Sequence, residues 1–283
     1  MADTVEKLAK LIEETSVSLP ADVEDALRAA KRREAAGSPA ERTLAAILGN
    51  CGLARRNRTP LCQDTGTLAF YVDSRLRRTA TPAALRKAVA LATVRGLLRK
   101  NCIDSVSGLS HDDNCAPGAP QIHYFDAEDR TKPPCVTLTM KGGGSENMSR
   151  QYSLPDAALG AGRDLEGVRR CILDATVSAQ GCGCAPGILG VCIGGDRAAG
   201  YATAKKQLLR GLKDRSPDET LAKLEKRVLA EANSLGIGPM GLGGKTTLLG
   251  VKIAALPRVP ASFFVTVAYM CWACRRKSLE FRP

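Results

Sequence analysis

Three segments of the sequence place a cysteine in a turn that is rich in glycine, proline or strand-forming residues. They are Leu61–Thr67 (LCQDTGT), Gly181–Gly187 (GCGCAPG) and Tyr269–Arg276 (YMCWACRR). Thiolates hold iron–sulfur clusters, and ligands that lie far apart in the sequence can converge in the fold. Three thiolates on a four-iron cluster would leave one iron open, and an open iron is a Lewis acid for a substrate hydroxyl and carboxylate. The spacing alone does not distinguish such a site from three unrelated buried cysteines.

Polar and glycine-rich residues lie close to these cysteines in the sequence. Gln63 and Asp64 follow Cys62 directly, so hydrogen-bonding groups stand beside a possible metal ligand. The run Gly142–Gly144 follows an expected strand, and because glycine has no Cβ its N–H groups can approach a ligand closely. Lys245 lies in a further glycine-rich turn and is a candidate contact for an anion.

Two familiar motifs fail because their surroundings are wrong. The segment GGKTT at 243–247 lacks the first glycine of a P-loop, since position 239 is proline, and a helix rather than a strand is expected before it. The CWAC pair at 271–274 is followed by only nine residues, too few for the sheet of a thioredoxin-like fold. A structural zinc site is the main non-catalytic alternative, because four thiolates can close a tetrahedron. Its ligands would be Cys182, Cys184, Cys271 and Cys274.

Composition and charge exclude several classes of protein. The chain has 283 residues, of which 44% are hydrophobic and 25% charged, an ordinary globular composition. The net charge of +12 is spread along the chain without interleaved aromatic residues, so we expect no nucleic-acid binding. The odd number of cysteines, 11, argues against a disulfide framework. We expect a cytoplasmic protein with no membrane segment, because neither a signal peptide nor a run of about 20 apolar residues is present.

The hydrophobic periodicity predicts an α/β fold with mixed sheet elements and a helical N-terminal layer over residues 1–58. We expect one domain covering residues 1–283. The expected helices after the N-terminal layer are Ala83–Lys100, Glu166–Val177, Tyr201–Leu212 and Glu219–Leu235, and the expected strands are Thr67–Asp73, Val136–Met140, Gly187–Ile193, Val251–Ala255 and Phe263–Ala268. Glycine-rich turns follow several of these strands, which is where α/β enzymes place their sites.

Five ordered motifs resemble the class I, iron–sulfur-dependent fumarate hydratases and L-tartrate dehydratases, in their α subunit or N-terminal region. The motifs are LCQDTGT at 61–67, KGGGSEN at 141–147, GCGCAPGILGVCIGG at 181–195, GIGPMGLGGKTT at 236–247 and PASFFVTVAYMCWACRR at 260–276. Together they extend the resemblance over essentially the whole chain. The resemblance implies the iron–sulfur hydro-lyase α-region fold and a [4Fe–4S] cluster.

The resemblance also implies roles for individual residues. Cys62, Cys184 and Cys271 would be the cluster ligands, with Cys182 as the alternative to Cys184. Gln63 and Asp64 resemble residues that contact the substrate. Arg99 falls where an arginine reaches a substrate carboxylate, which suits the fork of a guanidinium; a solvated arginine at a helix end is the alternative. Gly142–Gly144 and Lys245 would contact the same small dicarboxylic acid.

Two departures from the family pattern shape the expected function. Val259 occupies the position where the single-chain fumarases have a histidine, so tartrate and a methylated fumarate (mesaconate) are alternatives to fumarate as substrate. The family's catalytic base lies in a β region for which this sequence has no counterpart. We therefore expect a separate β subunit, assembled with this chain as an α2β2 hetero-oligomer.

Overall fold

In the part of the chain that the structure describes, each of the two four-stranded sheets belongs to its own compact unit, and β2 and β3 pair as a separate two-stranded sheet. The computed structural model describes residues 2–281. The first unit comprises residues up to 20, residues 49–143 and residues from 273 onward, and the second comprises 21–48 and 144–272. The chain therefore passes between units within the Gly142–Gly144 run and just after Cys271. The prediction of a single domain over 1–283 stays a prediction.

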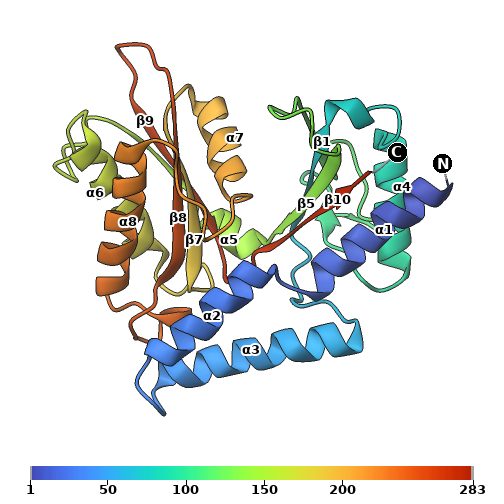
Figure 1. Cartoon of the computed structure of the whole chain (residues 1–283), viewed down its shortest axis with the longest axis horizontal. Helices are drawn as coiled ribbons and strands as arrows, with labels where there is room; N and C mark the ends of the chain where they lie inside the picture. Colours follow the sequence, from blue (N-terminus) through green and yellow to red (C-terminus); the bar gives the residue numbers. More distant parts are fainter. Residues whose placement is uncertain (1, 282–283) are drawn as a thin grey trace. The chain divides into compact units, whose positions relative to one another are not determined.

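The first unit is a four-stranded mixed sheet with two helices on one face (Figure 1). Its strands lie in the order β10-β5-β1-β4, with β1 parallel to β4 and antiparallel to β5. Leu68, Phe70 and Val72 alternate along β1 and pack with Leu8 and Leu85 from the two helices in one core. The elements are α1 (Ala2–Val17), β1 (Thr67–Asp73), η1 (Ser74–Leu76), α4 (Pro82–Val94), β2 (Cys102–Ile103), β3 (Ser110–His111), β4 (Gln121–Phe125), β5 (Cys135–Lys141) and β10 (Arg275–Glu280).

The second unit is also a mixed sheet, covered on both faces by helices (Figure 1). Its strand order is β6-β9-β7-β8, and every residue of the inner strand β7 is buried, as expected for a strand covered on both sides. The elements are α2 (Ala21–Arg33), α5 (Gly143–Asn147), β6 (Arg150–Ser153), α6 (Leu165–Ala179), β7 (Gly187–Gly194), α7 (Arg197–Gln207), α8 (Glu219–Ser234), η2 (Pro239–Gly241), β8 (Leu248–Leu256) and β9 (Phe264–Met270). Helix α3 (Pro39–Asn57) starts in this unit and ends in the first.

Alternate residues of β7 face opposite sides of the sheet, and different helices cover the two sides. Leu189, Val191 and Ile193 pack with α6 and α8 in one core. Gly190 faces the other way, where an added Cβ would lie 2.1 Å from the backbone oxygen of Ala204 in α7.

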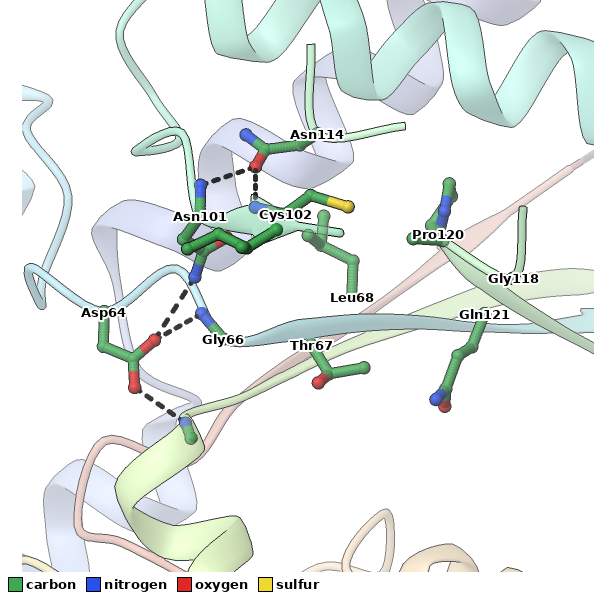
Figure 2. Close-up of a pocket in the computed structure, with 13 residues that line it drawn as sticks. Asp64, Gly66, Thr67, Leu68, Asn101, Cys102, Asn114, Gly118, Pro120 and Gln121 are labelled. Carbon is green, nitrogen blue, oxygen red and sulfur yellow. Dashed lines mark hydrogen bonds between the residues drawn. The ribbon is translucent and has the colours of Figure 1, made fainter. Parts of the chain in front are cut away.

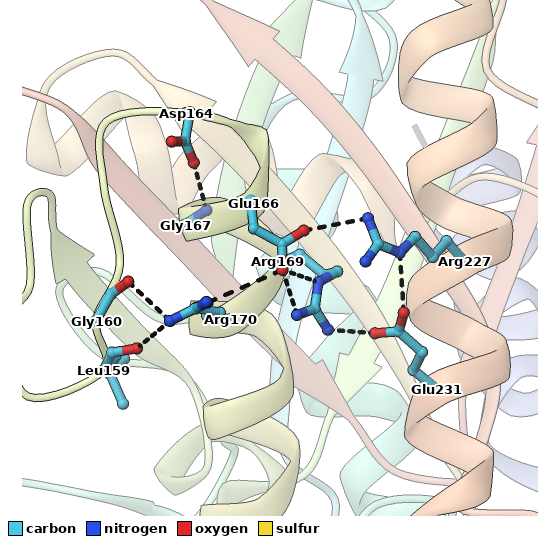
Figure 3. Close-up of polar contacts among 9 residues, drawn as sticks. All are labelled: Leu159, Gly160, Asp164, Glu166, Gly167, Arg169, Arg170, Arg227 and Glu231. Carbon is cyan, nitrogen blue, oxygen red and sulfur yellow. Dashed lines mark hydrogen bonds and ion pairs between the residues drawn. The ribbon is translucent and has the colours of Figure 1, made fainter.

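A network of ion pairs also joins α6 to α8: Glu166 and Glu231 both bind Arg169 and Arg227 (Figure 3).

The structure confirms the α/β class, the mixed sheets and the helical N-terminal region, and it corrects several boundaries. The helix expected over Ala83–Lys100 ends at Val94, because Gly96 adopts a φ of +72° and the N–H groups of Gly96 and Leu97 close the helix end on Thr93 and Ala92. The helix expected over Tyr201–Leu212 is α7, which ends at Gln207. Strands β6 and β10 and the short helix α5 were not expected from the sequence.

Candidate functional site

The turn after Cys62 is fastened by the carboxylate of Asp64 (Figure 2). One carboxylate oxygen of Asp64 accepts a hydrogen bond from the N–H of Gly66 at 2.8 Å and one from the Asn101 amide at 3.4 Å. The other accepts one from the N–H of Gly143 at 2.7 Å. A single side chain thus connects the LCQDTGT turn, the glycine run and the segment after Arg99, all within the first unit.

Two glycines make this arrangement possible. Gly66 has a φ of +73°, and a Cβ there would lie 2.4 Å from the carbonyl oxygen of Lys141. A Cβ at Gly142 would lie 2.9 Å from the carboxylate of Asp64. The turn and the glycine run therefore approach each other more closely than residues with side chains would allow.

The backbone of Arg99 is clamped on two sides. Its N–H donates to the hydroxyl of Thr65 at 2.8 Å, and the same hydroxyl donates back to its carbonyl at 3.0 Å. The amide of buried Asn114 donates to that carbonyl at 3.1 Å and also accepts hydrogen bonds from the N–H groups of Asn101 and Cys102. The side chain of Arg99 is exposed, so its backbone is fixed while its guanidinium is available to a ligand.

A pocket of about 370 Å³ opens beside Asp64 (Figure 2). This volume lies in the ordinary range for small-molecule sites. Its wall combines polar groups and glycines from four segments of the first unit: Asp64, Gly66, Thr67, Leu68, Asn101, Cys102, Ile103, Asn114, Gly118, Ala119, Pro120, Gln121 and Gly143. Cys62 and Gln63 directly precede Asp64 in the sequence, and the Cys62 thiol lies 3.7 Å from the amide oxygen of Gln63.

Arg275 is a buried residue of this region that the sequence did not single out. Its side chain is 1% exposed, and one guanidinium nitrogen donates to the backbone oxygen of Asp64 at 2.8 Å. Its Nε and Nη1 have no hydrogen-bond partner among residues 2–281. No local pattern distinguishes it from Arg276, because its burial results from the pairing of β10 with β5.

In the second unit, Cys184 sits in a strained turn that is tied to the segment of Cys271. Cys184 has a φ of +53°, a left-handed conformation that non-glycine residues seldom adopt and that is often found at functional sites. Its carbonyl accepts a hydrogen bond from the N–H of Trp272 at 3.2 Å. Cys182 is exposed and has no such backbone conformation. Cys184 and Cys182 thus differ both in backbone conformation and in exposure.

Tyr269 fills the space beneath this turn. A Cβ added to Gly183 would lie 2.4 Å from the Tyr269 ring, and one added to Gly187 would lie 2.5 Å from its hydroxyl oxygen. Burial raises the pKa of the Tyr269 hydroxyl above its ordinary value, and the nearby thiols of Cys271 and Cys184 raise it further. The two cysteines therefore share one neighbourhood in the second unit.

The remaining predicted residues lie elsewhere in the second unit. The backbone N–H of Lys245 donates to both carboxylate oxygens of Glu34, at 3.0 and 2.9 Å, while its side chain is exposed. The preceding loop reaches the Cys184 turn, since the N–H of Met240 donates to the carbonyl of Ala185 at 2.9 Å. A Cβ on Gly144 would lie 4.0 Å from the carbonyl of Cys182.

The predicted site residues thus fall into two groups. The first unit assembles Cys62, Gln63, Asp64, Arg99, Gly142 and Gly143, and the second carries Gly144, Cys184, Lys245 and Cys271. Within the described residues, no group of three or more histidine, cysteine or acidic side chains is placed to hold a metal ion. The convergence of the three cysteines and the individual roles stay predictions.

Comparison with known proteins identifies the family. The family model described as fumarate hydratase (Fumerase) matches residues 5–280. The chain belongs to this family. The resemblance found in the five motifs is therefore confirmed.

Several relatives with assigned names match the chain over most of its length. A Geobacillus stearothermophilus protein named "Putative fumarate hydratase class I" is 47% identical over 100% of this chain and 56% of its own length. A Methanocaldococcus jannaschii protein named "Putative L(+)-tartrate dehydratase subunit alpha" is 32% identical, over 95% of this chain and 94% of its own. The "L(+)-tartrate dehydratase subunit alpha" of Escherichia coli K12 is 29% identical, over 93% and 86%. The chain therefore spans little more than half the length of the first of these.

The cysteine thiolates of this chain suit the iron–sulfur cluster that membership of the family implies. Thiolates are the usual ligands of iron–sulfur clusters, and Cys184 and Cys271 lie in one neighbourhood of the second unit. Cys62, in the first unit, is only half-buried and so open to a ligand.

Among the described residues, no helix is long and apolar enough to cross a membrane.

Proposed function

We propose that this chain is the α subunit of a hydro-lyase that reversibly adds water to fumarate to give malate. The observation that carries the proposal is the 47% identity, over the whole chain, with the relative named "Putative fumarate hydratase class I". The polar pocket around Asp64, with the Arg99 backbone held beside it, supports a small dicarboxylic acid as substrate.

The residues of the first unit bind and orient that diacid. The guanidinium of Arg99 pairs with a carboxylate, and Gln63 and Asp64 orient the substrate and the water. The glycine run supplies N–H donors, but the N–H of Gly143 already donates to Asp64. A substrate carboxylate therefore competes with Asp64 for this donor, which couples substrate binding to the position of the Asp64 carboxylate. Lys245, which belongs to the second unit, is the proposed further cation.

Cys62, Cys184 and Cys271 are the proposed ligands of a [4Fe–4S] cluster, with Cys182 as the alternative second ligand. When bound, the cluster supplies a Lewis-acidic iron that polarises the substrate C–O bond. The strained backbone at Cys184 supports its selection. The zinc-site alternative gains no support from the family match.

A separate β subunit completes the enzyme in this proposal. The Geobacillus relative continues well beyond the matched part, and the tartrate dehydratase relatives carry the words "subunit alpha" in their names. The β subunit would provide the base that removes the proton from the carbon next to the hydroxyl. We propose an α2β2 assembly in the cytoplasm.

L-Tartrate dehydration is the second candidate, favoured by the matched lengths. The chain covers 94% and 86% of the two tartrate dehydratase relatives, against 56% of the fumarate hydratase relative. The deciding experiment reconstitutes the chain anaerobically with the candidate β subunit and compares kcat/KM for malate, L-tartrate and mesaconate. Malate should be preferred. Preference for tartrate would replace fumarate hydration by the second candidate, and absence of all three activities in an iron-loaded complex would reject the hydro-lyase.

Single substitutions test the cluster ligands. Cys62→Ser, Cys184→Ser and Cys271→Ser should each abolish the anaerobic iron–sulfur absorption, because a serine hydroxyl is a poor substitute for a thiolate. Cys274→Ser is the matched control and should keep it. If Cys182→Ser removes the cluster and Cys184→Ser spares it, the second ligand has been assigned wrongly.

A further inference from the structure

Tyr269 buries a hydroxyl that has no hydrogen-bond partner among residues 2–281. The side chain is 1% exposed, so bulk water does not satisfy it. Buried polar groups are nearly always paired, and an unpaired one destabilises the fold. Phenylalanine would fill the same volume without this cost, so an acceptor outside the described protein atoms is the simplest reason for a tyrosine.

The placement of Tyr269 indicates what that acceptor is. Tyr269 lies in β9, which ends at Met270, and Cys271 follows directly after the strand. The ring also lies against Gly183 and Gly187, which flank Cys184 in the sequence, and its hydroxyl is nearest to Gly187. The unpaired hydroxyl therefore lies close to the Cys184 turn, and the thiols of Cys184 and Cys271 are both near enough to raise its pKa.

We propose that the Tyr269 hydroxyl donates a hydrogen bond to an anionic sulfur, thiolate or sulfide, of the cluster held by Cys184 and Cys271. This inference rests on the proposed function, since it requires a cluster. Hydrogen bonds to cluster sulfurs stabilise the more negative reduced state and so raise the reduction potential. Tyr269 therefore makes the cluster easier to reduce and makes its iron harder for a chelator to remove.

Tyr269→Phe tests the inference because it removes one oxygen atom and keeps the ring. In the iron-free chain, Tm should be unchanged or higher, since an unpaired buried hydroxyl is lost. In the iron-loaded chain, an EPR-monitored titration should give a lower reduction potential, and iron loss to a chelator should be about five times faster, as expected for one net hydrogen bond.

Tyr152→Phe provides a matched control in the same unit. The Tyr152 hydroxyl donates to the carboxylate of Asp174 at 2.7 Å, so it is already paired. Its removal should lower Tm of the iron-free chain and leave the potential and the rate of iron loss unchanged. The two tyrosines should thus show opposite patterns of stability and cluster retention.

Two results would overturn the inference. If Tyr269→Phe binds iron with the wild-type potential and rate of loss, the hydroxyl is satisfied by an internal water. If it lowers Tm of the iron-free chain as Tyr152→Phe does, its partner is protein. A wild-type chain that takes up no iron would instead reject the proposed function, so the two failures are distinguishable.

Discussion

The turn around Cys62 and the turn around Cys184 present the same kind of side chain by different means. The first is held by polar groups, with Asp64, Thr65 and Asn114 satisfying backbone N–H and carbonyl groups from separate segments. The second is held largely by close packing, with glycines pressed against the Tyr269 ring. The first turn should therefore be sensitive to loss of hydrogen bonds and the second to added volume.

The largest effect should come from added volume at the packed turn. Gly183→Ala places a Cβ 2.4 Å from the buried ring of Tyr269, so the free energy of unfolding should fall by about 3 kcal/mol. Gly52→Ala in α3 is the matched control, because a Cβ there meets nothing within 4 Å; the variant should gain about 0.5–1 kcal/mol. Chemical denaturation measures the free energy of unfolding of both variants. Equal values would contradict the idea that close packing holds the turn around Cys184.

At the polar turn, the next largest effect should come from Asn114→Ala. The substitution leaves the N–H groups of Asn101 and Cys102 and the carbonyl of Arg99 without this partner. We expect a loss of about 2–3 kcal/mol in unfolding free energy, together with a lower kcat/KM of the assembled enzyme. A stable variant with normal kinetics would show that the clamp on Arg99 is dispensable.

Arg99→Ala removes the guanidinium and keeps the hydrogen bonds to the backbone of residue 99. Loss of a charge-assisted contact to a carboxylate should lower kcat/KM of the assembled enzyme by about 10- to 100-fold, with iron content and Tm unchanged. Arg95→Ala is the control, because Arg95 is an exposed residue four positions earlier whose ion pair with Glu6 lies on the surface. Loss of iron in Arg99→Ala would contradict its role as a substrate contact.

A smaller effect is expected from Thr65→Val. Valine keeps the shape of threonine but removes the hydroxyl that bonds both the N–H and the carbonyl of Arg99, so we expect a loss of about 1–2 kcal/mol. Thr65→Ser retains the hydroxyl and should lose less. Thermal denaturation of the pair measures the difference, and the reverse order would indicate that packing, not hydrogen bonding, holds this turn.

The smallest effect should appear as a pH dependence at the far end of β1. The hydrogen bond from Arg75 lowers the pKa of Asp73. The contribution of this carboxylate to stability is therefore full above its ordinary pKa of about 4 and is lost as the pH falls toward the lowered value. Tm of Asp73→Asn should be lower near neutral pH but should decline less than that of the wild type below pH 4. Parallel curves would rule out this contribution.

The sequence predicted what is encoded locally and missed what pairing at a distance creates. The bounds of β1 follow from its run of β-forming residues, and the core faces of α1 and α8 follow from helical periodicity. Strand β10 was missed because Arg275–Glu280 is mostly polar and becomes a strand through pairing with β5. Helix α5 was missed because it opens with glycines.

The site shows the same division. Cys62 and Asp64 could be selected from a motif and Arg99 from the family resemblance, and the structure brings the backbones of these segments together. Thr65, Asn101, Asn114 and Tyr269 could not, because nothing local shows that a polar side chain is buried or what it bonds. Their roles depend on segments that lie 13 to 86 positions away and meet only in the fold, as Asn114 meets Asn101 and Tyr269 meets Gly183.

At position 99, the groups that hold the residue in place contact its backbone, while the side chain proposed to bind the substrate is not involved in holding it. Every hydrogen bond that holds it runs to backbone atoms, so residues of different length and charge can be exchanged there without rebuilding the surrounding loop. Related proteins could therefore change the diacid they accept by altering one outward-facing group on an otherwise constant frame. In laboratory evolution, position 99 is a natural first site to randomise.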